Sequence, residues 1–389
     1  MSASTLTMRH AGRARLHVDM VVVGLVSALL LLGLVMVASA SVTIAARDGD
    51  PFFYVERQLL FALVGVACGA VALRIPTEVW ERFSNVLLVA AIVMLVLVLV
   101  PGLGHSVNGS KRWLRLAGLN FQASEAARVL LLIYLCSYLV RREEEVRTSV
   151  VGVLKPLAVL GFAALLLLLE PDFGSGVVLL ATGIGMLFLA GIRLRHFLAL
   201  CATAPALLAV VAISSPYRVK RLITFVDPWV DPFNSGFQLT QSLIAIGRGE
   251  WFGVGLGASI QKLFYLPEAH TDFVFAVLGE ELGFVGIALV VALVLGIAYR
   301  SLVIARNAAE AGLKFQSYLA AAFGIWFGLQ AFINMGVNMG LLPTKGLTLP
   351  LLSYGRSSLV VTLGWIGILL RVHHETQSTR SVALRGGAR

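Results

Sequence analysis

Three titratable side chains fall at alternate positions just before a long apolar segment. Glu268, His270 and Asp272 end a polar stretch of the chain, and the residues that follow are mostly hydrophobic. A carboxylate or an imidazole beside low-dielectric surroundings is a candidate general acid or base. The alternative is structural, with Thr271 or Asp272 capping the helix that follows. A zinc site is less favoured, because His105 is the one further histidine that the spacing places on the same side.

Other charged residues lie inside or between the apolar segments. Glu280 and Glu281 come two helical turns later, and charges at such a depth usually face a cavity or a partner. Glu125 and Arg128 are three residues apart on one helix face, so they either pair with each other or belong to a site. The two carboxylates of the turn at 170–172 could bind a metal, neutralise a cation or cap the next helix, and capping or pairing is favoured.

Cations recur in the connections between these segments. Lys111 and Arg112 lie in one short connection, Lys345 lies in another, and Arg218 belongs to a basic run at 217–221. Arg and Lys form charge-assisted bonds with phosphoryl oxygens, so the run is either a phosphate clamp or an attraction to anionic lipid headgroups. Both interpretations apply if the substrate is itself a lipid phosphate.

The composition identifies the solvent in which these residues must be positioned. Hydrophobic residues make up 58% of the 389 residues, charged residues only 13%, and the mean hydropathy is +0.88. A chain this apolar predicts an all-α polytopic membrane protein, because helices satisfy their own backbone in lipid. The net charge of +10 does not indicate nucleic-acid binding, since the basic residues are scattered rather than gathered on one face.

Ten apolar segments are long enough to be membrane helices. Lys and Arg are more frequent on the N-terminal side of the predicted membrane, so both termini are expected in the cytoplasm. We expect an uncleaved first helix, a basic tail at 1–18, a membrane domain at 19–371 and a second basic tail at 372–389. The predicted spans are 19–42, 58–75, 84–101, 124–140, 151–169, 173–191, 196–214, 272–299, 316–341 and 351–371.

The extracytoplasmic connection at 215–271, between spans seven and eight, is by far the longest. Loops of this length are usually functional or disordered. This one is rich in Trp and Phe, so it is expected to pack on the membrane surface with short helices of its own.

Several short motifs follow one another in a characteristic order, and together they resemble the SEDS family (shape, elongation, division and sporulation). The resemblance extends over 19–375 and is closer to the FtsW subfamily than to the RodA subfamily. Arg356 stands where relatives commonly have Gly, and Arg128 where Lys is usual. If that Gly has a positive φ, Arg356 would strain the turn before the tenth span. The motifs lie at 108–113, 121–125, 170–174, 241–247, 266–273, 279–283 and 349–355.

The resemblance implies a peptidoglycan glycosyltransferase that polymerises lipid II during septal cell-wall synthesis in cell division. The 4-hydroxyl of one lipid-linked disaccharide attacks another, and undecaprenyl pyrophosphate leaves. Asp272 matches the family's catalytic aspartate and is the expected general base, with Glu268 and His270 shaping its surroundings. The other expected substrate-binding or supporting residues are Lys111, Arg112, Arg218, Lys345, Glu125, Arg128, Gln241 and Ser353.

The resemblance makes no cofactor certain, although a divalent cation, Mg²⁺ or Mn²⁺, is a candidate for offsetting the leaving-group charge. The implied partners, besides lipid II, are a class B penicillin-binding transpeptidase and other divisome membrane proteins. The implied location is the cytoplasmic (inner) membrane at the division septum, with the site facing the periplasm or the cell exterior.

Three further functions fit part of the sequence: a lipid II flippase, a RodA-like elongation polymerase and a non-catalytic septal scaffold. Ten helices with buried charges also describe a transporter. Transport would need a polar path to the inner leaflet, whereas most of the intramembrane charge lies near the outer side. The enzyme is therefore the favoured interpretation.

Overall fold

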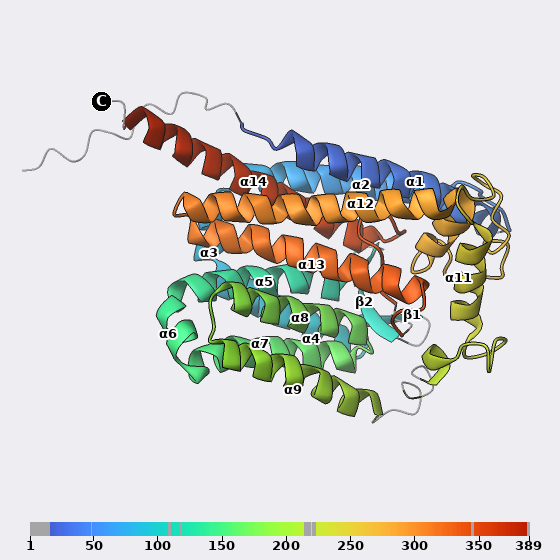
Figure 1. Cartoon of the computed structure of the whole chain (residues 1–389), viewed down its shortest axis with the longest axis horizontal. Helices are drawn as coiled ribbons and strands as arrows, with labels where there is room; N and C mark the ends of the chain where they lie inside the picture. Colours follow the sequence, from blue (N-terminus) through green and yellow to red (C-terminus); the bar gives the residue numbers. More distant parts are fainter. Residues whose placement is uncertain are drawn as a thin grey trace, which may run out of the picture.

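The computed structural model describes residues 16–47, 49–107, 110–116, 119–213, 219, 223–343 and 346–386. Ten of its helices coincide with the ten predicted apolar segments. Figure 1 shows that these helices form a bundle and that their axes run along roughly the same line. Seven are long and apolar enough to cross a membrane, while α4, α8 and the described start of α9 are shorter apolar helices. The all-α polytopic membrane fold is confirmed, and the count of ten spans stays a prediction. The ten helices are α1 (Met20–Arg47), α2 (Phe53–Arg74), α4 (Ser84–Leu99), α5 (Ala123–Arg141), α7 (Val150–Leu169), α8 (Phe173–Leu189), α9 (Leu194–Ile213), α12 (Val274–Glu310), α13 (Lys314–Asn338) and α14 (Arg356–Gly386).

The last helix differs from its predicted bounds at both ends. α14 begins at Arg356 rather than at 351, and Arg356 is not among the residues with a positive φ, so the predicted strain does not arise. The helix then continues into the predicted tail at 372–389. Arg380 donates a hydrogen bond of 2.8 Å to Glu310, at the end of α12. This contact holds the polar part of α14 against the bundle. α12 also extends beyond its predicted end at 299, to Glu310.

The sequence does not predict the small antiparallel sheet that joins α4 to α5. Its strands, in the order β1-β2-β3, are β1 (Gly104–Val107), β2 (Ser110–Leu116) and β3 (Leu119–Gln122). Leu114 of β2 lies opposite Phe121 of β3 and is buried in a cluster with Val98 and Ala123. The strands are too short for a clear period-two pattern, so the sequence indicates a loop at this position. The sheet matters here because it carries Arg112.

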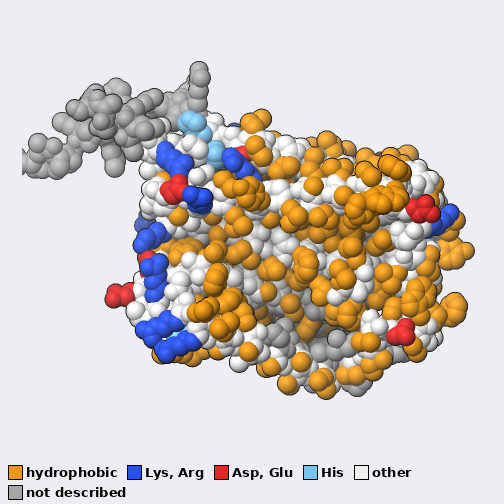
Figure 2. All heavy atoms as spheres, viewed as in Figure 1, with side chains coloured by type: hydrophobic (Ala, Val, Ile, Leu, Met, Phe, Trp, Pro, Cys, Tyr) orange, Lys and Arg blue, Asp and Glu red, His pale blue; other side chains and the backbone are white. Residues whose placement is uncertain are grey.

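The two ends of the bundle differ in charge. The short helices α3 (Thr77–Arg82) and α6 (Glu143–Thr148) lie at the end where α14 leaves the bundle (Figure 1). Figure 2 shows most of the visible Lys and Arg side chains gathered at this end, with hydrophobic side chains spread over the middle of the face and a few charged side chains at the other end. Such a surface fits a bundle surrounded by lipid, with a basic end at one membrane face.

The long connection contains the short helix that the sequence predicts. This helix, α11 (Phe237–Arg248), lies at the opposite end of the bundle from α6 (Figure 1). It packs against α12, and Ser242 donates a hydrogen bond of 2.8 Å to the carbonyl of Asn338 at the end of α13. The connection therefore forms a folded cap on the bundle.

A break in α12 locks this cap to the bundle. The backbone is non-helical at Gly283, with φ 63° and ψ −160°. The carbonyl of Glu280 accepts from the N–H of Val254 at 3.0 Å, and the N–H of Phe284 donates to the carbonyl of Glu250 at 2.9 Å. The long connection thus satisfies the backbone groups that the break frees, as a membrane environment requires.

The two deep glutamates hold the same junction from the side-chain side. Glu280 and Glu281 are both fully buried. Glu280 pairs with Arg248 at 2.9 Å, and Glu281 pairs with Lys262 at 2.8 Å. The prediction that these carboxylates face a partner is confirmed, and both partners belong to the long connection.

Gly249 at this junction should not accept a side chain. A Cβ on Gly249 would lie 1.8 Å from the carbonyl oxygen of Gly279, whereas a Cβ on Gly247 would meet nothing within 4 Å. Gly249→Ala is expected to destabilise the protein by about 1–3 kcal/mol through overpacking. Gly247→Ala, in the last turn of α11, is expected to be neutral or slightly stabilising. The midpoint of thermal unfolding is measured for both purified variants in the same detergent. Equal midpoints would contradict the close packing of Gly249 against Gly279.

Candidate functional site

Asp272 lies directly at the start of α12, where two amides of α13 hold its backbone. The Nδ2 groups of Asn334 and Asn338 donate to the carbonyl of Asp272 at 2.9 and 3.0 Å. Asn338 Oδ1 also accepts from the N–H of Ala276 at 3.2 Å, which satisfies a first-turn donor of α12. The alternative that Thr271 or Asp272 caps this helix is wrong, because the cap residue is Phe273 and a side chain from α13 acts instead.

The Asp272 carboxylate and the Arg112 guanidinium face the same space beside Gly346. A Cβ built on Gly346 would lie 3.2 Å from Asp272 Oδ2 and 3.8 Å from Arg112 Nη1. Three connections, those before α12, before α5 and before α14, therefore meet at this point. A general base and a fixed cation side by side can take up a proton and stabilise a developing negative charge.

Arg112 also fixes the turn between α7 and α8. It donates to the carbonyls of Glu170, at 3.4 Å, and Pro171. Asp172 is the N-cap of α8 and accepts from the N–H of Ser175 at 3.2 Å, so the predicted capping role is confirmed for this carboxylate. The turn positions Arg112 and needs no metal to do so.

The other carboxylate of the turn is unusual. Glu170 is fully buried, and neither of its side-chain oxygens has a hydrogen-bond partner within the described part of the chain. Burial and, to a smaller extent, the nearby charge of Asp172 raise the pKa of Glu170, the charge of Arg112 opposes the rise, and the result is a pKa of about 8. Glu170 therefore holds a proton at neutral pH.

His270 packs in an aromatic cluster with Tyr54 and Tyr354. Its ring centroid lies 4.6 Å from that of Tyr54 and 5.6 Å from that of Tyr354. Burial lowers the pKa of His270, so the imidazole is neutral at pH 7. Glu268 is exposed and accepts a hydrogen bond of 2.7 Å from Thr271. Both residues flank Asp272 along the chain, as expected.

Glu125 and Arg128 form a buried ion pair, so the structural alternative for these two residues is confirmed. Arg128 Nη1 also donates to Gln330 Oε1 at 2.8 Å, and Gln330 Nε2 donates to the carbonyl of Thr348 at 3.1 Å. The pair thus reaches the segment that carries Gly346 through one amide of α13. It supports the site without entering the space beside Asp272.

Ser353 and Gln241 have less direct places. Ser353 is buried, its Oγ accepts from the N–H of Leu349 at 2.8 Å, and its carbonyl accepts from Gln58 at 3.1 Å. Ser353 therefore shapes the segment before α14. Gln241 is half-buried on α11, next to Ser242.

Three predicted cations cannot be placed. Arg218 and Lys345 lie outside the described residues, and only the backbone of Lys111 is described, in β2. Within the described ranges there is no group of three or more His, Cys, Asp and Glu side chains that could hold a metal ion. The divalent cation stays a prediction.

The sequence interpretation missed the amides of α13. Gln330, Asn334 and Asn338 are spaced four residues apart on one helix face, and all three are buried. Asn334 Nδ2 donates to the carbonyl of Leu347 as well as to that of Asp272. Three amides at helical spacing in an apolar span were the signal that could have identified them.

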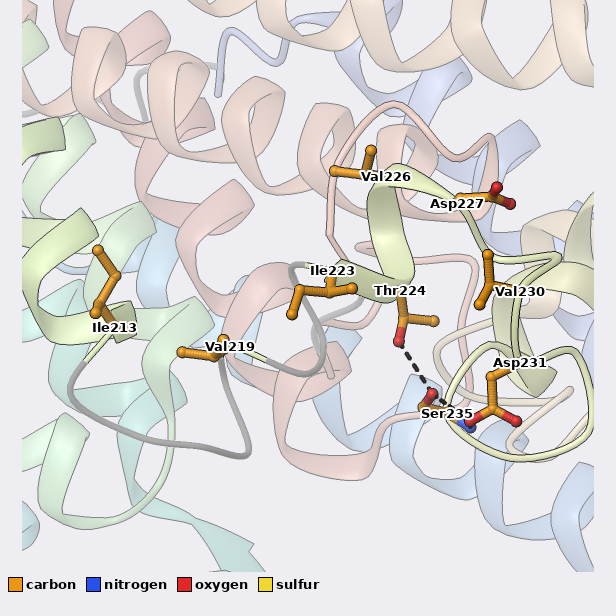
Figure 3. A pocket seen from close by; sticks show the side chains of 9 residues that line it. All are labelled: Ile213, Val219, Ile223, Thr224, Val226, Asp227, Val230, Asp231 and Ser235. Atoms are coloured by element: carbon orange, nitrogen blue, oxygen red, sulfur yellow. Dashed lines mark hydrogen bonds between the residues drawn. The ribbon is translucent and has the colours of Figure 1, made fainter.

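A hollow of about 800 Å³ lies away from these residues, between the end of α9 and the start of the long connection. Figure 3 shows Ile213, Ile223 and Val226 among its apolar lining, with a hydrogen bond of 3.0 Å between Thr224 and Ser235. Its walls are mostly apolar and open to the surroundings. They suit a hydrocarbon chain better than a sugar.

The sequence and the fold both match known proteins. Residues 19–378 match the FtsW/RodA/SpoVE family model, described as "Cell cycle protein". The chain is 59% identical to a probable peptidoglycan glycosyltransferase FtsW of Thioalkalivibrio sulfidiphilus over 90% of this chain and 88% of that protein. It is 55% identical to the same-named protein of Nitrosococcus halophilus over 97% of each chain.

Two solved structures have the same fold. One is a chain of the structure described as "Structural coordination of polymerization and crosslinking by a peptidoglycan synthase complex". It matches with a TM-score of 0.75 and 31% identity, over 93% of this chain and 99% of that chain. The rod shape determining protein RodA of Thermus thermophilus matches with a TM-score of 0.69 and 28% identity, over 93% and 98% of the two chains.

The buried Glu170 should make stability depend on pH. The folded protein keeps a proton that the unfolded chain releases above the ordinary value of 4.5, so stability falls as the pH rises from 4.5 to about 8. Glu170→Gln is expected to flatten this fall and to stabilise the protein at pH 8 by a few kcal/mol, at about 1.4 kcal/mol per pKa unit. The midpoint of thermal unfolding, measured at several pH values in this range, shows how steeply stability falls. The same change at an exposed carboxylate, Glu144→Gln, is the control. An unchanged slope in Glu170→Gln would count against the buried acid.

Proposed function

The chain belongs to the FtsW/RodA/SpoVE family and is a peptidoglycan glycosyltransferase, and we propose that it polymerises lipid II with Asp272 as the general base. The observation that carries this assignment is the meeting of the Asp272 carboxylate and the Arg112 guanidinium beside Gly346. One group accepts the proton of the attacking hydroxyl, and the other faces the charge that develops on the leaving group.

The reaction transfers a glycan from one lipid diphosphate to a second sugar. Asp272 takes the proton of the 4-hydroxyl on the acceptor disaccharide, and that oxygen forms a bond with C1 of the donor glycan. The bond between C1 and the diphosphate oxygen breaks, and the polyprenyl diphosphate leaves with the electron pair. Arg112 offsets the negative charge that the diphosphate gains.

The position of Asp272 suits a carboxylate that must be ionised to act as a base. It lies at the N-terminal end of α12, where the helix dipole favours negative charge. The amides of Asn334 and Asn338 hold its backbone and leave the carboxylate oriented toward Gly346. Proximity of this kind, rather than a special chemical group, supplies much of the rate enhancement in such reactions.

The other parts of the substrate and the membrane also fit this arrangement. The apolar hollow at the end of α9 suits part of a polyprenyl chain, and the basic run at 217–221 includes one of its lining residues, Val219. The site lies at the end of the bundle opposite the basic end, which supports a position on the outer face of the inner membrane. We further propose that the protein acts at the division septum, and the description of its family as "Cell cycle protein" supports this location.

We also propose a class B penicillin-binding transpeptidase as a partner, together with other divisome membrane proteins. The matching synthase complex is described as coordinating polymerisation with crosslinking, and its chain covers 93% of this one. The long connection presents exposed aromatic residues, such as Phe233 and Phe252, at the end of the bundle where such a partner would act.

Asp272→Asn should abolish polymerisation while leaving the fold intact. The amide keeps the size of the side chain but accepts no proton, so the rate should fall by at least about a hundredfold. The assay resolves glycan polymers made from labelled lipid II by the purified protein, with and without its transpeptidase partner. Asp50→Asn, the same change at an exposed outer carboxylate, is the control and should be fully active.

Polymer from Asp272→Asn at the wild-type rate would refute the assignment of the base. Lipid II translocation in liposomes that survives Asp272→Asn, with no polymer from the wild-type protein, would identify a flippase instead. If the wild-type protein neither polymerises nor translocates lipid II but is still recruited to the septum, it would be a scaffold.

Gly346→Ala should slow the chemical step. The added methyl group would press on the Asp272 carboxylate, since its position lies 3.2 Å from Oδ2. Displacement by a few tenths of an ångström is expected to lower kcat by roughly tenfold, with a smaller effect on KM. Gly364→Ala, where a Cβ meets nothing within 4 Å, is the matched control. Steady-state rates at several lipid II concentrations measure both constants, and an unchanged kcat would show that this space is not the reacting centre.

A further inference from the structure

A second polar cluster lies beside Asp272, on the side of the chain that faces α2. Three aromatic rings meet there: Tyr54 from the start of α2, His270 from the long connection, and Tyr354 from the segment before α14. The N–H of Tyr354 donates to the carbonyl of His270 at 2.9 Å, which fixes the two segments together. His270 is two residues from Asp272, so their Cα atoms are less than about 8 Å apart.

Two guanidinium groups adjoin this cluster. Arg57 is exposed and lies 3.9 Å from the centre of the Phe53 ring, and Arg356 is half-buried at the first residue of α14. Burial raises the pKa of Tyr354, and the charges of Arg356 and Arg57 both oppose that rise. The Arg356 guanidinium lies 6.0 Å from the centre of the Phe61 ring, so both cations pack against aromatic rings of α2.

Neither cation has an acidic partner in the part of the chain that the structure describes. Among the described residues, Arg57 and Arg356 form no ion pair with a carboxylate, unlike Arg128, Arg248 and Lys262. Arg356 also sits at the N-terminal end of a long helix, where the helix dipole disfavours a positive charge and favours an anion. The Nδ1 atom of His270 is buried without a hydrogen-bond partner in the described part of the chain.

The proposed reaction requires a second anion site of this kind. Donor and acceptor are both lipid diphosphates, and they must be held at the same time. Arg112 faces the diphosphate that leaves, so the diphosphate that stays attached to the acceptor needs cations elsewhere. A cluster that lies close to Asp272 along the chain and does not include Arg112 satisfies that requirement.

We infer that Arg57, Arg356 and the Tyr54–His270–Tyr354 cluster form an anion subsite that binds the diphosphate of the acceptor lipid. This inference rests on the proposed polymerase function. The guanidinium groups would each bind phosphoryl oxygens in the bidentate way that favours Arg, and the Tyr354 hydroxyl would add a neutral donor. Because this diphosphate does not react, the subsite governs binding rather than the chemical step.

The first test is a separation of KM from kcat in vesicles of neutral phosphatidylcholine. Arg57→Gln and Arg356→Gln are each expected to raise the KM for lipid II by about tenfold, the loss of one charge-assisted contact, with kcat nearly unchanged. Arg356→Lys should restore part of the affinity. Arg47→Gln removes an exposed cation from the end of α1 and should leave both constants unchanged.

The second test does not depend on catalysis. In protein carrying Asp272→Ala and Arg112→Gln, which lacks the cation proposed for the leaving diphosphate, binding of undecaprenyl diphosphate is measured by tryptophan fluorescence with and without each further Arg substitution. The affinity should fall by about the same factor as KM rises. If Asp272→Ala retained activity, the assignment of Asp272 as the base would be wrong. The binding measurement would still show whether the subsite exists.

Two results would overturn the inference. Unchanged KM and unchanged binding of undecaprenyl diphosphate in neutral vesicles would show that the cations do not contact the substrate. An effect that occurs only in vesicles containing phosphatidylglycerol would assign both cations to anionic membrane headgroups. Unfolding midpoints equal to wild type establish that Arg57→Gln and Arg356→Gln are folded, and Arg356→Lys gives a further folded comparison.

Discussion

The structure depends on the hydrogen bonds that three amides of α13 make to backbone carbonyls. The helix α13 holds two other parts of the chain through these bonds: the segment before α14 and the backbone of Asp272. The amides are those of Gln330, Asn334 and Asn338. Carbonyls in irregular segments near lipid have no water to bind, and each would be costly if left unpaired. The same bonds that remove this cost also bring Gly346 beside Asp272. Stability and the geometry of the site therefore have one cause.

The break in α12 gives the long connection a similar hold on the site. The first part of α12 has Asp272 at one end and Glu280 and Glu281 at the other, and both glutamates are paired with cations of the long connection. Backbone bonds across Gly283 fasten the two together a second time. A short helix clamped at both ends moves as a unit, so displacement of the long connection would be transmitted to Asp272. The described part of the long connection from α11 onward is thus fastened to the bundle by both backbone and side-chain bonds.

Hydrophobic pattern alone predicted where the helices lie, because lipid imposes one strong constraint on every span. Residue chemistry made Asp272 and Arg112 candidates and predicted the buried pair of Glu125 with Arg128, while the expected role of Asp272 as the base came from the family resemblance and stays a proposal. The strands that carry Arg112 were missed because they are too short to show a period. The amides of α13 were missed because their role depends on carbonyls from segments far away in the sequence. Backbone acceptors leave no mark in a sequence, so contacts of this kind are found only in a structure.

The distribution of cations follows from the same division between structure and function. Cations with a structural role are paired: Arg128 with Glu125, Arg248 with Glu280, and Lys262 with Glu281. A cation without such a partner has no counterion in the described part of the protein. Arg57 and Arg356 lack carboxylate partners among the described residues, and they adjoin the backbone that carries Asp272. An anionic substrate is the counterion that we infer for both cations.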